Sequence, residues 1–159
     1  ALHVPAVESE RTWQTIQAGV LAAVQSLKPQ ARGQRVYFEV SPAPYGASEA
    51  SFIGETLQRM GMVNILPAAL GPFPQVNPEF VVRAQPDVIM AGDSSRASMA
   101  QRPGWSGLRA MQSQRLCVFK TRDADTLVRA GPRMAEGAQL MAACLNRAAG
   151  PATSPGAER

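Results

Sequence analysis

Four short apolar segments alternate with helix-like segments along this chain, and this alternation restricts the fold more than any other feature. The four segments are RVYFEV (35–40), MVNIL (62–66), DVIMAG (87–92) and RLCVFK (115–120). Apolar runs of this length, bounded by Gly, Pro and Asn, are typical of buried strands. Strands that alternate with helices form a mostly parallel sheet through right-handed crossovers. The sequence therefore predicts an α/β fold with three layers, a small mostly parallel sheet with helices on both faces.

The segments between the strands carry the apolar spacing of helices. Trp13, Ile16, Val20, Val24 and Leu27 recur every three or four residues, which predicts an amphipathic helix over 9–28 that begins at Ser9 and buries this stripe. Further helices are predicted over 49–60 with Ser48 as its cap, over 77–85, 95–101 and 105–114, and over 132–148. The start at Asn77, Pro78 and Glu79 has the strongest helix signals: a cap, a proline in the first turn and an acidic side chain.

The totals favour one globular domain and argue against two classes of partner. With 159 residues, 45% of them hydrophobic, the chain is large enough to bury a core. No run approaches the roughly 18 apolar residues of a membrane helix. The net charge is +4, but the basic residues are spread along the chain, so nucleic-acid binding is not expected. We divide the chain into an N-terminal helix region (1–34), an α/β lobe (35–148) and a disordered tail (149–159).

Signals for catalysis are missing from the sequence. Neither a dinucleotide-binding nor a phosphate-binding glycine loop occurs, and there is no nucleophile elbow. His3 is the only histidine, which argues against a zinc site and a triad base. Together with the missing motifs, this leads us to expect no metal site, no catalytic residue and no cofactor. Asp93, which follows the strand 87–92, could serve as the phosphoacceptor of a receiver-like signalling domain. The alternative is that Asp93 caps the next helix, and we prefer it.

The two cysteines, Cys117 and Cys144, leave the redox state of the chain open. They lack the spacing of a metal or redox motif, and Cys117 lies inside an apolar strand. A disulfide would require an oxidising compartment. Two buried free thiols are the alternative, which we slightly favour.

Ligand-binding side chains are expected on three loops. In a parallel sheet, ligands bind beyond the carboxyl ends of the strands, where loops 41–48, 67–78 and 121–131 begin. Tyr45 and Phe73 supply aromatic walls, and Asp125 and Arg129 supply polar anchors, a combination that suits a flat and bulky organic ligand. Alternatively, each aromatic residue covers its own sheet edge, and Asp125 and Arg129 form an ordinary surface ion pair.

Several segments resemble one known family at consistent spacing. They are RVYFEV, PYGASEASFIGETLQRMGMVNILP (44–67), GPFPQVNPEFVVRAQPDVIMAG (71–92) and VRAGPRMAEGAQLMAACL (128–145). They resemble the C-terminal lobe of the periplasmic substrate-binding proteins of ABC importers for cobalamin, haem and ferric siderophores, and its cobalamin-binding members most. The likeness covers residues 35–147, and helix 9–28 resembles the end of the long helix that joins the two lobes.

The resemblance implies a function and a role for each site residue. Such a protein binds a bulky metal chelate in the cleft between two lobes and docks onto an ABC permease in the inner membrane through one acidic residue per lobe. Glu79 matches the docking glutamate of the C-terminal lobe, which would meet an arginine cluster on the permease. Phe73 and Tyr45 match aromatic residues that contact the corrin ring, and Asp125 and Arg129 match polar residues at the cleft edge.

Four expectations complete this prediction. The chain is a binding protein and no enzyme, and its ligand is cobalamin or a related corrinoid, with haem or a ferric siderophore as the alternative. Its location is periplasmic, or extracytoplasmic and membrane-anchored. We expect an N-terminal lobe outside this sequence to complete the cleft, although a natural single lobe is the other interpretation.

Overall fold

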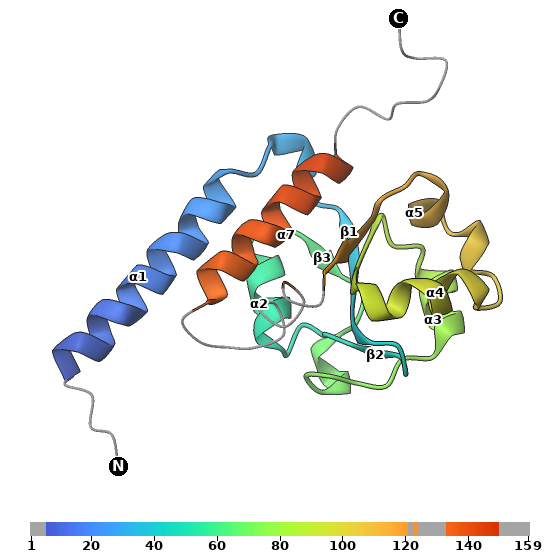
Figure 1. The fold of residues 1–159 in the computed structure, drawn as a ribbon, viewed down its shortest axis with the longest axis horizontal. Helices are drawn as coiled ribbons and strands as arrows, with labels where there is room; N and C mark the ends of the chain where they lie inside the picture. The colour runs from blue at the N-terminus through green and yellow to red at the C-terminus, as the bar shows by residue number, and fades with distance from the viewer. Residues whose placement is uncertain (1–5, 121–122, 124–132, 150–159) are drawn as a thin grey trace, which may run out of the picture.

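The computed structural model describes residues 6–120, 123 and 133–149, and it places one sheet between layers of helices (Figure 1). In these residues the sheet has five strands, β1 (Arg35–Ser41), β2 (Tyr45–Gly46), β3 (Val63–Asn64), β4 (Val88–Gly92) and β5 (Leu116–Phe119). The strand order is β2-β1-β4-β5, and β3 pairs with the start of β1. Only β2 is antiparallel to its neighbour. The predicted α/β fold with a mostly parallel sheet is confirmed.

Six α-helices and three 3-10 helices surround the sheet in the described residues. The α-helices are α1 (Ala6–Gln25), α2 (Phe52–Arg59), α3 (Pro78–Ala84), α4 (Asp93–Gln101), α5 (Arg109–Gln112) and α7 (Met134–Ala148). The 3-10 helices are η1 (Pro29–Ala31), η2 (Ala68–Leu70) and η3 (Trp105–Gly107). Within the part of the chain that the structure describes, none of the helices is long and apolar enough to cross a membrane.

Both faces of the sheet are buried, and each face has its own apolar core. Val36 and Phe38 of β1 point to one face, where they pack in a cluster with side chains from α1, α2 and α7. Tyr37, between them, points to the other face and packs with side chains from α3, α4, η3 and α5. This opposite orientation follows from the two-residue period of a strand. It explains why the strand segments are apolar without a break.

Helix α1 packs along α7 as part of the first core. Ile16, Val20, Ala23 and Leu27 are buried in this cluster. A side chain at Gly19 would collide with Ala135 of α7, so glycine allows the two helices to approach closely. At the other end of the contact, the Asn146 side chain accepts a hydrogen bond from Lys28 N and donates one to Ser26 O, at 2.8 and 3.0 Å.

Trp13 does not belong to the buried stripe, and this part of the prediction is wrong. Its side chain is 53% exposed. The helices run in the same direction, with Gly19 beside Ala135 and Lys28 beside Asn146. Because α7 begins only at Met134, the first turns of α1 extend past it, as Figure 1 shows. The apolar spacing predicted the correct face of the helix but not the length of its partner.

Several helix starts also differ from the predictions. Helix α1 begins at Ala6, so Ser9 lies inside the helix. Helix α2 is capped by Ser51, whose hydroxyl accepts a hydrogen bond from Gly54 N at 2.9 Å, and not by Ser48. Asp93 is the first residue of α4 and follows the cap position instead of occupying it. The cap at Asn77 is confirmed, because its side chain accepts a hydrogen bond from Glu79 N at 2.9 Å.

Cys117 and Cys144 form a disulfide, which corrects the preference for two free thiols. Cys117 lies on the face of β5 that packs against α7, and Cys144 lies on the face of α7 that packs against the sheet. Their Cα atoms are 6.0 Å apart, within the range that a disulfide spans. The sequence did not show which face of β5 meets which face of α7, and this pairing of faces brings the two sulfur atoms together.

We predict that loss of the disulfide lowers the free energy of unfolding by about 3.5 kcal/mol, the value expected for a cross-link of this loop length. The two cysteines are 27 residues apart in the sequence. The test is urea unfolding of the oxidised protein and of the double variant Cys117→Ala, Cys144→Ala. Addition of a reductant should destabilise the wild-type protein and leave the double variant unchanged. Equal unfolding midpoints for the two oxidised proteins would contradict the prediction.

Candidate functional site

Two of the three loops predicted to bind ligand are joined to each other at the carboxyl end of β1. The first carries β2, and the second leads from η2 to α3. Three backbone hydrogen bonds of 2.9 to 3.1 Å connect them, from Val76 to Pro44, from Gly46 to Pro74 and from Ser48 to Pro72. Residues 41–48, predicted as loop only, therefore contain a short strand. The pairing holds both loops in one position relative to the sheet.

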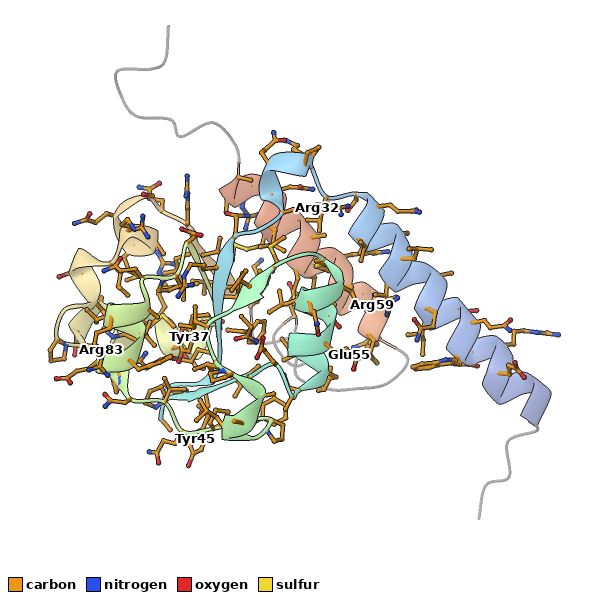
Figure 2. All side chains as sticks on the ribbon, turned by 180° about the vertical axis from the view of Figure 1, so that it is seen from behind. Arg32, Tyr37, Tyr45, Glu55, Arg59 and Arg83 are labelled. Atoms are coloured by element: carbon orange, nitrogen blue, oxygen red, sulfur yellow. A yellow bond between two sulfur atoms is a disulfide. The ribbon has the colours of Figure 1, made fainter. Side chains whose placement is uncertain are left out.

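Tyr45 and Phe73 lie on these paired loops with much of each ring accessible. Tyr45 is 39% exposed and Phe73 is 40% exposed, so neither ring is buried under the sheet edge. Phe73 packs edge-on against Phe52 of α2, with ring centroids 6.4 Å apart. Figure 2 shows Tyr45 at the margin of the molecule, whereas Tyr37 lies in its interior. The two rings are available to a ligand, and their ligand contact stays a prediction.

The loop that carries Tyr45 is anchored to α2 by a close backbone approach. A side chain at Gly54 would collide with the carbonyl group of Ser48, so only glycine fits in this first turn of α2. The side chain of Asn64 on β3 donates a hydrogen bond to Ala47 O at 3.0 Å. Ser48 Oγ donates to Gly71 O in the second loop. These contacts fix the loops before any ligand arrives.

Glu79 lies in the first turn of α3 and is exposed to solvent. Among the described residues it takes part in no ion pair. Arg83 is exposed one turn further along the same helix. Between η2 and α3 lies a pocket with a volume of about 330 Å³, lined by side chains that include Leu66, Leu70, Val76, Phe80 and Arg83. Glu79 does not itself line this pocket, but its exposed carboxylate, without an ion pair among the described residues, can meet a basic side chain of another protein.

A buried polar cluster lies beneath the two loops, and the sequence analysis missed it. Glu39, on β1, is 1% exposed. Its carboxylate accepts two hydrogen bonds from the guanidinium of Arg102, at 2.7 and 3.0 Å, and one from the Tyr37 hydroxyl at 2.8 Å. A charged residue within an otherwise apolar strand was the available signal, because a buried carboxylate requires a partner.

The cluster extends to two other segments through Arg102 and Trp105. Arg102 Nη2 also donates to Pro42 O in the first loop, at 3.3 Å. The guanidinium carbon lies 4.5 Å from the centroid of the Trp105 ring, a cation–π contact. The Trp105 ring is fully buried, packs edge-on against Tyr37 and donates from Nε1 to Pro78 O at 3.2 Å. Pro78 is the first residue of α3, directly before Glu79.

Burial and the adjacent Glu39 carboxylate raise the pKa of Tyr37 far above its ordinary value. Burial makes the larger contribution, because ionisation would place a charge in an apolar core. The nearby Arg102 guanidinium acts in the opposite direction and does not offset the increase. Tyr37 therefore stays protonated and acts as a hydrogen-bond donor throughout the neutral range.

The sequence analysis also named Asp125, Arg129 and Asp93 as candidate site residues. Asp125 and Arg129 lie outside the described residues. Asp93 begins α4 directly after β4. Within the described residues, no group of three or more His, Cys, Asp or Glu side chains is arranged to hold a metal ion.

The sequence matches the family described as periplasmic binding protein over residues 6–122. The chain belongs to this family. The match includes β1 to β5 together with α1, so it covers the paired loops, the buried cluster and the helix that carries Glu79. The resemblance to this family is confirmed, and the matched residues include the quoted segments 35–40, 44–67 and 71–92.

One curated relative and two solved structures illustrate the similarity. The chain is 33% identical over 110 residues to YvrC of Bacillus subtilis, an uncharacterized ABC transporter substrate-binding lipoprotein. The aligned region covers 67% of this chain and 34% of the relative. The periplasmic haem-binding protein BhuT in complex with two haems is similar in fold, with a TM-score of 0.68, 20% identity and coverage of 88% of this chain and 56% of that chain. The periplasmic vitamin B12 binding protein BtuF of Vibrio cholerae has a TM-score of 0.65 and 22% identity, and the match covers 87% of this chain and 51% of that chain.

The chain therefore spans about a third of the length of this curated relative and about half of each solved structure. At these identities the solved structures show the fold alone.

We predict that Tyr37→Phe changes the alkaline stability profile. The unfolded chain releases the Tyr37 proton near pH 10, whereas the native protein retains it. The free energy of unfolding of the wild-type protein should therefore fall above pH 10 by an additional ~1.4 kcal/mol per pH unit. Tyr37→Phe should be about 1 kcal/mol less stable at pH 7, because Glu39 loses a donor. This difference should narrow above pH 10, measured by urea unfolding from pH 7 to 11. Parallel profiles for the two proteins would contradict the prediction.

Proposed function

We propose that this chain is the C-terminal lobe of an ABC importer's substrate-binding protein and that it delivers cobalamin or a related corrinoid to a membrane permease. The match to the periplasmic binding protein family over residues 6–122 carries the proposal. The exposed aromatic rings of Tyr45 and Phe73, on loops held together at the carboxyl edge of the sheet, provide the ligand surface. The family membership favours binding over catalysis and over a receiver-like role for Asp93.

The ligand class follows from the chemistry of this edge. Aromatic faces on a rigid backbone suit a large, flat and partly apolar ligand, because little conformational freedom is lost on binding. Proteins of similar fold bind haem or vitamin B12, as their descriptions state. Haem or a ferric siderophore is therefore the alternative ligand. Asp125 and Arg129 are proposed as polar contacts at the same edge.

The partner is an ABC permease in the inner membrane, and Glu79 is proposed as the docking residue of this lobe. Its carboxylate is exposed and takes part in no ion pair among the described residues. A carboxylate of this kind can pair with arginine side chains of a permease without first breaking an existing salt bridge. YvrC, the curated relative, is described as an ABC transporter substrate-binding lipoprotein, which supports such a partner.

The proposed location is periplasmic, or extracytoplasmic and membrane-anchored. The Cys117–Cys144 disulfide supports it, because disulfides persist in oxidising compartments. The solved relatives are about twice as long as the region they share with this chain. We therefore propose that a second lobe completes the cleft, and that an isolated lobe binds ligand only weakly because half of the walls are missing.

We predict that the full-length protein binds cyanocobalamin more tightly than haemin or a ferric hydroxamate in parallel fluorescence titrations. Phe73→Ala should weaken binding about tenfold through loss of ring contact. Val63→Ala is the control, because Val63 is also exposed but lies in β3 beside the amino end of β1, away from the proposed ligand surface. No binding of any of the three compounds would overturn the proposal, and preferred binding of haemin or the hydroxamate would establish the alternative ligand.

We also predict that Glu79→Gln in the full-length protein weakens association with the permease about tenfold and leaves the ligand affinity unchanged. The amide keeps the shape of the side chain but loses the charge that an arginine would pair with. Association is measured with the permease reconstituted in nanodiscs. Glu55→Gln serves as the control, because Glu55 is likewise an exposed carboxylate in the first turn of a helix. Wild-type association of Glu79→Gln would remove the docking role.

A further inference from the structure

The buried cluster contacts both surfaces that the proposed function uses. Arg102 donates to Pro42 O, three residues before Tyr45 in the ligand loop. Trp105 donates to Pro78 O, one residue before Glu79 on the docking helix. Arg102 and Trp105 contact each other through the cation–π stack at 4.5 Å. A continuous chain of contacts therefore leads from the ligand loop through the interior to the first turn of α3.

Arg102 and Trp105 are themselves held firmly in place. The carboxylate of Glu39 binds the guanidinium with two hydrogen bonds and has no exposed side-chain surface, while the side chain of Arg102 is only 10% exposed. A bidentate pair of this kind fixes the orientation as well as the position of the guanidinium plane. The edge of Tyr37 packs against Trp105 with ring centroids 5.9 Å apart. Both donors are thus oriented by groups on β1, the central strand.

Stability alone does not account for where these donors point. A buried ion pair contributes little net stability compared with apolar residues of the same volume. In this cluster, Arg102 and Trp105 each direct a donor away from β1 to a backbone carbonyl group of a surface segment. Pro42 belongs to the first of the paired loops, and Pro78 is the first residue of α3, directly after the second loop. Arg102 and Trp105 thus connect the two surfaces, and we call this pair of residues the brace.

We propose that Arg102 and Trp105 are positioning residues that fix the ligand loop and the docking helix relative to one another. Arg102 holds the loop through Pro42 O, and Trp105 holds the first turn of α3 through Pro78 O. This inference rests on the proposed function, because it assigns the two surfaces to ligand and permease. It adds a role for two interior residues that contact neither partner.

The test compares conservative variants of the full-length protein. Trp105→Phe keeps a ring beneath the guanidinium and against Tyr37 but removes the donor to Pro78 O. We expect permease association to weaken about fivefold, the effect of one lost hydrogen bond, with cyanocobalamin affinity within twofold of wild type. Arg102→Lys keeps the charge but loses the forked geometry. We expect it to weaken cyanocobalamin affinity about fivefold and permease association as well.

Two controls separate positioning from a general loss of stability. Ile53→Val removes one methylene from the other core cluster, so it lowers the melting temperature without touching the brace. Arg96→Lys makes the same exchange as Arg102→Lys at an exposed site on α4, the helix that ends directly before Arg102. Both controls should bind cyanocobalamin and the permease like the wild-type protein. Lower stability alone would not make Trp105→Phe bind the permease more weakly while it binds cyanocobalamin like the wild-type protein.

The outcomes distinguish the positioning role of Arg102 and Trp105 from the docking role of Glu79. If Glu79→Gln weakens permease association and Trp105→Phe does not, the positioning role is overturned and the docking role stands. If Glu79→Gln has no effect, the docking role fails and the positioning of α3 fails with it. Wild-type cyanocobalamin affinity of Arg102→Lys overturns the loop half of the brace. If Arg102→Lys does not fold, Trp105→Phe alone decides.

Discussion

Burial of the Glu39 carboxylate is the constraint on which the arrangement of the carboxyl edge of the sheet depends. A carboxylate on the central strand, without exposed side-chain surface, must be matched by donors. Arg102 and Tyr37 supply them, and this requirement determines where the segment after α4 returns to the sheet. Trp105 then covers the guanidinium and reaches the start of α3. One buried charge thus connects β1, the loop 41–48 and the start of α3.

The opposite face of the sheet is built by different means. There the core is almost entirely apolar, and α1 and α7 close over it by direct contact at Gly19 and Ala135. The Cys117–Cys144 disulfide fastens α7 to the last strand. The face with the Glu39 cluster therefore lies beneath the surfaces for which we propose partners, whereas the other face carries the disulfide and the two long helices. Close packing on this face and the hydrogen-bonded cluster on the other both favour a rigid lobe.

The elements of the fold followed from local patterns, whereas the contacts between distant segments did not. The strand segments and the cap at Asn77 were predictable, because strand composition and capping act within a few residues. The exposure of Trp13 was not, since it depends on where α7 begins. The ion pair between Glu39 and Arg102 joins residues 63 positions apart, and no local pattern indicates such a partner. Of the site, the sequence supplied Tyr45, Phe73 and Glu79 as hypotheses, and the interior that supports them came only from the structure.

The placement of the two tryptophans has a practical consequence for spectroscopy. Trp13 and Trp105 are the only tryptophans of the chain; the first is 53% exposed and the second is fully buried. Indole fluorescence shifts to the red in water, and a soluble quencher reaches only an accessible ring. The emission of this protein is therefore the sum of two separable signals, one from the outer turns of α1 and one from beneath the ligand loop. Without any attached label, the chain reports independently on its surface and on its interior.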